Sequence, residues 1–126
     1  MRLLLDTNIV VRLRQDERRI DTKTRRLIQE ATAVYVSAVS IWEIAIKASA
    51  RKLDVDVDRL ETALLEAGVT PLPMTWAHAL RSYDIAVAHP DPFDRLLLAQ
   101  AICEPLHLLT SDDRLAQYGR DLVITV

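Results

Sequence analysis

Four acidic residues stand where their carboxylates could meet, each at the end of a predicted strand or in the first turns of a predicted helix. They are Asp6, Glu43, Asp94 and Asp112. In open parallel α/β sheets, ligands bind beyond the carboxyl ends of the strands, so acids at those ends are candidates for chemistry. Two carboxylates about 4 Å apart repel each other by roughly 4 kcal/mol at an effective dielectric of ~20. Such a group must therefore raise its pKa values or bind cations.

A divalent metal ion is the cation that suits this group best. Oxygen-only ligands favour magnesium or manganese over zinc. The histidines His78, His89 and His107 have no metal-ligand spacing among themselves, so we expect them to be surface or hydrogen-bonded residues. The sequence therefore predicts a site for Mg²⁺ or Mn²⁺ and not a zinc centre.

Two of the acids have a simpler structural interpretation. Asp6 could cap the helix that follows it, because Asp, Thr and Asn all favour that position. Glu43 stands three residues after Ser40, which is the spacing of a capping box. However, Glu43 lies within the apolar segment 41–46, where an acid without a partner or an ion would be costly to bury. For Glu43 a functional role is therefore the better interpretation.

The segment 91–94 has the pattern of a helix start. Asp91 is the predicted N-cap, Pro92 takes the first helical position, and Asp94 lies in the first turn. Asp94 shares a helical face with apolar residues further along, so it should point inward while Asp91 stays at the rim. Of the adjacent pair near the other end of the chain, only Asp112 is expected to face the site, and Asp113 to be exposed.

The elements that must position these acids alternate between short apolar runs and segments of helical period. Strands are predicted at residues 3–5, 34–36, 69–72, 106–109 and 122–126, and helices at 22–31, 40–50, 57–67, 75–83, 92–103 and 112–118. This alternation implies a three-layer α/β/α sandwich with a central parallel sheet. Gly68 and Gly119 follow predicted helices, where a left-handed C-cap favours glycine. Residues 84–91 form the longest predicted loop.

Length and composition indicate one folded domain. The chain has 126 residues, half of them hydrophobic, which suffices for a core without disulfides. The first apolar run, residues 3–5, is too short for a signal peptide, and no later run could span a bilayer, so we expect a cytoplasmic protein with no membrane partner. Cys103 is expected to be a small hydrophobic residue on a buried helix.

The net charge of −2 is unlike that of a typical nucleic-acid binder, which carries a basic surplus. Metal ions would neutralise the acidic group, and basic residues are concentrated in one stretch. They are Arg12, Arg14, Arg18, Arg19, Lys23, Arg25 and Arg26. This stretch is either a solvated helix face and loop or an RNA-binding surface, and charge alone leaves both open. Arg14, Arg18 and Arg19 are the candidate RNA-binding residues.

Four segments of the chain, residues 3–8, 37–47, 91–101 and 108–112, match a known family in order and in spacing. With them the chain resembles the PIN-domain nucleases, in particular the VapC-like toxins of bacterial toxin–antitoxin pairs. The resemblance runs almost end to end, so residues 1–126 are expected to form a single PIN-like nuclease domain. One departure is Arg51, at a position where many members of this subgroup have glycine.

The resemblance implies that Asp6, Glu43, Asp94 and Asp112 are the acidic quartet of a metal-dependent endoribonuclease, with Mg²⁺ or Mn²⁺ as cofactor. Asp6, Asp94 and Asp112 are then direct or water-bridged metal ligands, and Glu43 orients a metal-bound water or a second ion. Three polar residues would fix the carboxylates by hydrogen bonds. They are Thr7, Asn8 and Thr110. The implied partners are RNA, a small VapB-like antitoxin that blocks the site, and a second copy in a homodimer.

Other functions remain as alternatives. One is a stand-alone PIN-domain nuclease for RNA processing. Another is a phosphatase of the haloacid dehalogenase type, which also places an Asp after its first strand but needs a second Asp where this chain has Asn8. A third is a binding module that keeps the fold without catalysis; its mark would be a missing acid, and none of the four is missing.

Overall fold

The computed structural model describes residues 1–85 and 91–126; His89 and most of the predicted loop at 84–91 lie outside the described residues. The elements follow one another along the chain in a regular alternation. They are β1 (Arg2–Leu5), α1 (Thr7–Gln15), η1 (Glu17–Arg19), α2 (Thr22–Glu30), β2 (Ala33–Ser37), α3 (Ala38–Ser49), α4 (Val57–Glu66), β3 (Thr70–Leu72), α5 (Trp76–Arg81), η2 (Ser82–Ile85), α6 (Pro92–Cys103), β4 (His107–Thr110), η3 (Asp113–Tyr118) and β5 (Val123–Thr125). Elements labelled η are short 3-10 helices.

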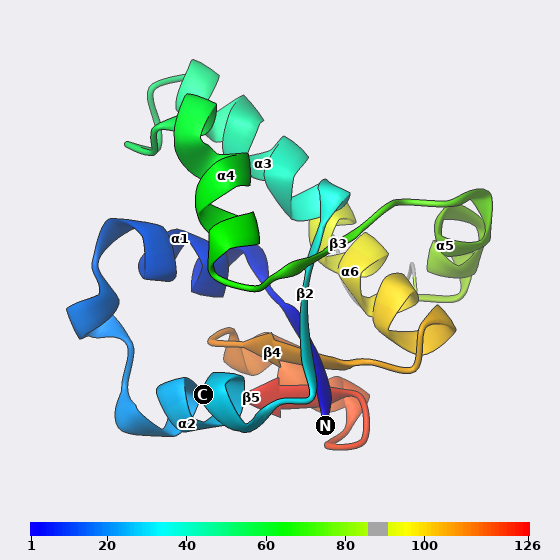
Figure 1. Ribbon diagram of the computed structural model, residues 1–126. Coiled ribbons are helices and arrows are strands. Elements are labelled where there is room, and N and C mark those ends of the chain that lie inside the picture. The colour runs from blue at the N-terminus through cyan, green and yellow to red at the C-terminus, as the bar shows by residue number, and fades with distance from the viewer. Residues whose placement is uncertain (86–90) are drawn as a thin grey trace.

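The strands form one parallel sheet in the order β3-β2-β1-β4-β5, so the first strand of the chain is the central one. Successive residues of β1 point to opposite faces of the sheet. Leu3 and Leu5 pack with residues of α1, α3 and α4, whereas Leu4 packs with residues of α6 and η3. Helices therefore cover both faces (Figure 1), which confirms the predicted three-layer sandwich.

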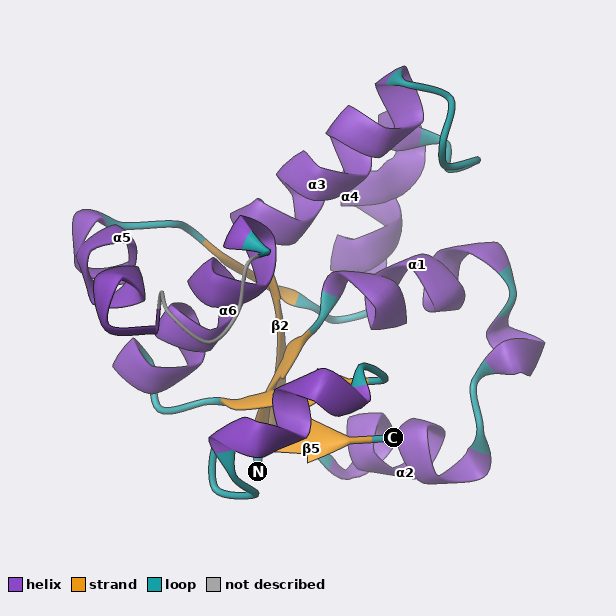
Figure 2. Ribbon diagram, turned by 180° about the vertical axis from the view of Figure 1, so that it is seen from behind, coloured by secondary structure: helices purple, strands orange, loops and turns teal. Residues whose placement is uncertain are grey.

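Helix α3 extends from the carboxyl end of β2 and lies beside α4 in both views (Figures 1 and 2). It begins at Ala38, two residues before the predicted start, because the buried Ser37 is its N-cap and accepts a hydrogen bond of 2.9 Å from the Val39 amide. Val39 packs on one face of the sheet and Ile44 on the other. Helix α3 thus crosses the edge at which the strands end.

Helix α1 is missing from the predicted elements. Its sequence alternates Ile9 and Val10, which are buried, with Arg12 and Arg14, which are exposed, so only a short apolar face marks it. At the other end of the chain, residues 113–118 form a 3-10 helix and not the predicted α-helix. The remaining predicted elements are present, with ends that differ by a few residues.

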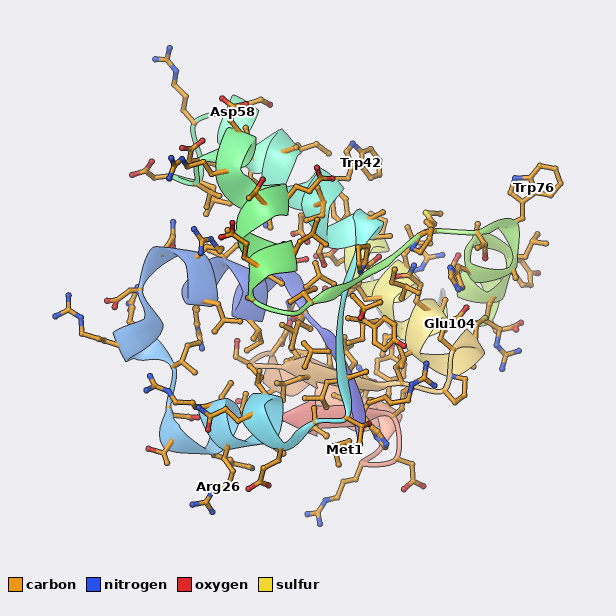
Figure 3. The ribbon with its side chains drawn as sticks, in the orientation of Figure 1. Met1, Arg26, Trp42, Asp58, Trp76 and Glu104 are labelled. Carbon is orange, nitrogen blue, oxygen red and sulfur yellow. The ribbon has the colours of Figure 1, made fainter. Side chains whose placement is uncertain are left out.

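A hydrogen-bonded histidine joins α5 to α6. His78 is fully buried; its Nδ1 accepts from the Thr75 amide at 3.1 Å, and its Nε2 lies 2.9 Å from Oε1 of Glu104 at the end of α6. Figure 3 shows Glu104 between these two helices, while Trp76 projects from α5 into solvent. His78 is therefore one of the hydrogen-bonded histidines that the sequence predicts.

Three residues adopt left-handed backbone conformations. Gly68, one residue past the C-cap of α4, has a φ of 86°, and Gly119, the C-cap of η3, has a φ of 88°, so both glycines lie just past a helix and have the positive φ that favours glycine. Arg51, just beyond α3, has a φ of 58°, a conformation that costs a side-chain-bearing residue energy.

Two surface findings complete the fold. Cys103 is exposed at the end of α6, so the prediction of a buried cysteine is wrong; the residue falls on the outer face of an otherwise buried helix. None of the helices in residues 1–85 and 91–126 combines the length and the apolar character needed to cross a membrane.

Candidate active site

Asp6 follows β1 and is the N-cap of α1, so capping and a place in the site are compatible. Its side chain is only 3% exposed. Oδ1 accepts from the Thr7 amide at 2.8 Å, and Oδ2 accepts from the Thr110 hydroxyl at 2.6 Å. The Asp6 amide donates to the Leu109 carbonyl on the neighbouring strand β4 at 2.9 Å. Both carboxylate oxygens are therefore held in one orientation.

The charge of Asp6 is destabilised by its surroundings. The pKa of Asp6 is raised from 3.8 to about 6, mainly by burial and in smaller part by the carboxylates of Asp94 and Glu43. The hydrogen bonds from Thr110 and Thr7 act in the opposite direction. Asp94 and Glu43 therefore both lie within electrostatic range of Asp6, so three of the four acids face the same end of the sheet, as the sequence predicts.

Thr110 connects two members of the quartet at the end of β4. While its hydroxyl donates to Asp6, the same oxygen accepts from the Asp112 amide at 3.0 Å. The predicted hydrogen bond from Thr110 to a carboxylate is thus present.

The other two polar residues behave differently from the prediction. The Thr7 hydroxyl donates to Ser40 of α3 at 2.9 Å, and it is the Thr7 amide that binds Asp6. Asn8 is exposed, and no hydrogen bond among the described residues joins it to a quartet carboxylate. The reason is helical phase: α1 begins at Thr7, so the next residue turns away from the strand ends.

Glu43 lies in the second turn of α3 and is 6% exposed. Because Ser37 caps α3, Ser40 is already inside the helix and binds Thr7, so the capping-box alternative is excluded. Lys47, one turn later, donates to Oε2 of Glu43 at 2.7 Å. This hydrogen bond is the main reason that the pKa of Lys47 lies above its usual value.

Asp94 occupies the first turn of α6 and is 8% exposed, so it points inward as predicted. Asp91 is the N-cap and accepts hydrogen bonds from the amides of Phe93 and Asp94 at 2.9 and 3.4 Å. The predicted helix start, with Pro92 in the first turn, is therefore confirmed.

An aromatic contact holds the start of α6 against α3. The Trp42 and Phe93 rings meet edge to face, with centroids 5.4 Å apart. Trp42 lies on the outer side of α3 (Figure 3). Trp42 directly precedes Glu43 and Phe93 directly precedes Asp94, so this contact joins the two helix turns that carry these acids.

Asp112 caps η3 and is bound by Arg114. The Arg114 guanidinium donates to both oxygens of Asp112, with Nη2 to Oδ2 at 2.7 Å and Nε to Oδ1 at 3.1 Å. The Asp112 carboxylate also accepts from the Arg114 amide at 2.9 Å. Asp113 is exposed, as predicted.

The sequence predicts no place in the site for three residues that the structure brings there: Ser40, considered only as a helix cap, Lys47 and Arg114. The spacing of Glu43 and Lys47 is that of an i, i+4 ion pair on a helix, a signal that the sequence carries. Arg114 follows Asp112 by two residues in a 3-10 helix, and no periodic pattern marks such a pair.

The donors suit a hard divalent cation in their chemistry, since they are oxygen atoms of buried and mutually repelling carboxylates. As they stand in residues 1–85 and 91–126, no three acidic, histidine or cysteine side chains are grouped closely enough to hold an ion. Direct ligation by Asp6, Asp94 and Asp112 therefore stays a prediction.

The predicted RNA-binding arginines lie away from the acids. Arg14 is near the far end of α1, roughly 12 Å along the helix from its capped start. Arg18 and Arg19 follow in η1, where Arg18 pairs with Asp16 at 3.6 Å. In Figure 1 this segment leads away from the sheet.

Comparison with known proteins agrees with this arrangement. A family model described as the PIN domain matches residues 3–121, nearly the whole chain. The chain belongs to the PIN-domain family. A curated relative, Ribonuclease VapC22 of Mycobacterium tuberculosis, is 28% identical over 131 residues, with 98% of this chain and 97% of the relative covered.

Solved structures share the PIN-domain fold. The toxin–antitoxin complex from Klebsiella pneumoniae contains a chain with a TM-score of 0.71 and 20% identity, covering 98% of this chain and 96% of that one. A chain of DNA-bound VapBC from Salmonella typhimurium gives a TM-score of 0.75 at 13% identity, covering 99% and 98%. At such identities the likeness shows the fold alone.

Proposed function

We propose that this PIN-domain protein is a divalent-metal-dependent endoribonuclease, with Mg²⁺ or Mn²⁺ as its cofactor, and the toxin of a toxin–antitoxin pair. The observation that carries the proposal is the convergence of Asp6, Glu43 and Asp94 at the carboxyl end of the sheet, where burial, and in smaller part the charges of Asp94 and Glu43, raise the pKa of Asp6 to about 6. The name of the curated relative, Ribonuclease VapC22, supports the same activity.

In this proposal Asp6, Asp94 and Asp112 hold the metal directly or through water, and Glu43 orients the attacking water or a second ion. A bound ion supplies a nucleophilic water and stabilises charge on the phosphate oxygens. Thr110 and the Thr7 amide fix the rotamer of Asp6, so that both of its oxygens keep one direction. A ligand fixed in this way loses less conformational entropy when an ion binds.

The arginines Arg14, Arg18 and Arg19 are proposed to bind RNA outside the reacting phosphate. Their distance from the acids along α1 allows contact with backbone several nucleotides from the cleavage point. Such contacts add affinity without reading sequence.

The proposed partners are RNA, a VapB-like antitoxin and a second copy of the chain. The proposed setting is the cytoplasm, and residues 1–126 are proposed to act as a single nuclease domain. Support comes from the structural neighbours, whose names are those of toxin–antitoxin and VapBC complexes. A stand-alone RNA-processing nuclease differs only in having no antitoxin gene beside its own. No observation favours the phosphatase alternative, because Asn8 is exposed and away from the carboxylates.

The decisive experiment compares two neighbouring acids of α6. Asp94→Asn should lower cleavage of a labelled RNA pool in Mn²⁺ by at least about 100-fold, because it removes a proposed ligand while keeping the side-chain size. Asp91→Asn should stay within about twofold of the parent, since Asn caps a helix as well as Asp.

Rates are read from RNA gels, and thermal melting confirms that both variants are folded. Full activity of purified Asp94→Asn would remove this residue from the site. Cleavage by the parent that persists unchanged in excess EDTA would contradict the metal-dependent mechanism.

A further inference from the structure

Two cationic side chains from different elements are bound to carboxylates of the acidic quartet. Lys47, on α3, donates to Glu43 at 2.7 Å. Arg114, in η3, donates hydrogen bonds to Asp112 from two guanidinium nitrogens. The carboxylates of both pairs are largely buried, with side-chain exposures of 8% for Glu43 and 17% for Asp112. The cations themselves face solvent, at 47% for Lys47 and 69% for Arg114.

Both cations also interact with a third carboxylate. Asp94 contributes to the raised pKa of Lys47 and to that of Arg114, although these residues come from different elements. Asp94 therefore lies within electrostatic range of both cations.

A carboxylate oxygen that accepts from a guanidinium or ammonium group is not fully available to a divalent ion. The guanidinium group of arginine is planar and can donate two parallel hydrogen bonds. Phosphate oxygens accept such a pair of hydrogen bonds as well as carboxylate oxygens do, so an arginine released from a carboxylate can bind a phosphate. Because the cationic partner of each pair faces solvent, water screens the pair, and exchange of partner costs less than it would for a fully buried pair.

We propose that Arg114, assisted by Lys47, is a phosphate-binding residue that exchanges partner: it binds Asp112 until a divalent ion takes that carboxylate, and then it binds the RNA phosphate beside the site. The inference rests on the proposed nuclease function and adds two residues to its substrate contacts. It predicts that the same arginine opposes metal binding and favours RNA binding.

The first test measures Mn²⁺ affinity by isothermal titration calorimetry, without RNA. Arg114→Gln should bind Mn²⁺ at least about threefold more tightly than the parent, because its competitor for Asp112 is gone. Arg114→Lys keeps the positive charge but loses the planar guanidinium group, so its Mn²⁺ affinity should lie between those of the parent and Arg114→Gln. Arg120→Gln removes an equal charge from an exposed residue at the opposite edge of the sheet, before β5, and should match the parent.

The second test measures binding of a labelled single-stranded RNA of mixed sequence in saturating Ca²⁺, with intact RNA confirmed on gels. Loss of one phosphate contact should reduce the slope of log affinity against log salt by about 0.7 in Arg114→Gln, and leave it unchanged in Arg120→Gln. Lys47→Gln should show a smaller effect of the same sign in both tests.

The outcomes separate this inference from the function on which it rests. If the parent binds neither Mn²⁺ nor RNA, the proposed nuclease function fails, and the inference with it. If the parent binds both but Arg114→Gln gains no Mn²⁺ affinity, or loses no salt dependence, the partner exchange is overturned and the nuclease assignment stands.

Discussion

The side chain of Asp6 is almost completely buried, although its carboxyl group can carry a negative charge. Because its pKa is about 6 in the folded protein and 3.8 as the reference value, the folded chain keeps a proton between these pH values that the unfolded chain has released. The stability that this group contributes is present below about pH 4 and is lost as pH rises through about 6.

This sign gives a prediction for the protein stripped of divalent ions with EDTA. The difference in free energy of unfolding between Asp6→Asn and the parent should shift in favour of the variant by up to about 3 kcal/mol from pH 4 to pH 7. Urea unfolding at both pH values measures it. Taking the difference between variant and parent removes other titrating groups from the comparison, and a difference that does not change with pH would contradict the prediction.

Which site residues the sequence could predict depends on how each is placed. Asp6 directly follows one strand and Thr110 ends another, and the carboxyl ends of parallel strands meet at one edge. The direction of the Asn8 side chain depends on the exact residue at which α1 begins. A shift of that start by one residue turns each side chain by about 100° around the helix axis. Arg114 depends on a local 3-10 turn, which has no sequence period to detect.

At the scale of elements, a helix is predicted correctly where its capping residues and the spacing of its apolar residues indicate the same boundaries. Helix α6 has Asp91, Pro92 and a run of buried residues, and its predicted ends are those observed. Helix α1 has a capping residue but a mean composition too polar to indicate burial, because only one narrow face meets the core. Tertiary packing decides such elements, and packing is not visible in a short sequence window.

The turn after α3 provides a stability prediction. Arg51 holds a left-handed φ of 58°, where glycine has no Cβ clash. Arg51→Gly should therefore stabilise the protein by about 0.5–1 kcal/mol, as relief of strain outweighs the added freedom of the unfolded chain.

Urea unfolding measures this change, with Arg51→Ala as the matched control. Alanine also removes the arginine side chain but keeps the Cβ, so it should not stabilise. A loss of stability in Arg51→Gly would show that the arginine side chain itself supports the turn.

At the scale of the whole molecule, the net charge is only −2, but the acidic and basic side chains are unevenly distributed. The acids converge at one edge of the sheet, while Arg14, Arg18 and Arg19 lie along the segment that leads away from it. A ligand that neutralises the acidic edge should stabilise the entire fold, because it binds the folded state alone.

Mn²⁺ at about 100 times its Kd should raise the free energy of unfolding by about 2.7 kcal/mol, and thus raise Tm by several degrees. Thermal melts across a Mn²⁺ series measure the effect. Asp91→Asn should keep the full rise and Asp94→Asn should lose most of it. An equal rise in both variants would place the ion elsewhere on the molecule.

The hydrogen bond between Thr110 and Asp6 spans 104 positions of the chain. On a ribosome, Asp6 is synthesised 104 positions before Thr110, and the central strand β1 then waits for its neighbour β4. The acidic edge therefore cannot assemble before β4 has been made. A nascent chain, surrounded by messenger and ribosomal RNA, is without its complete site until that strand is available.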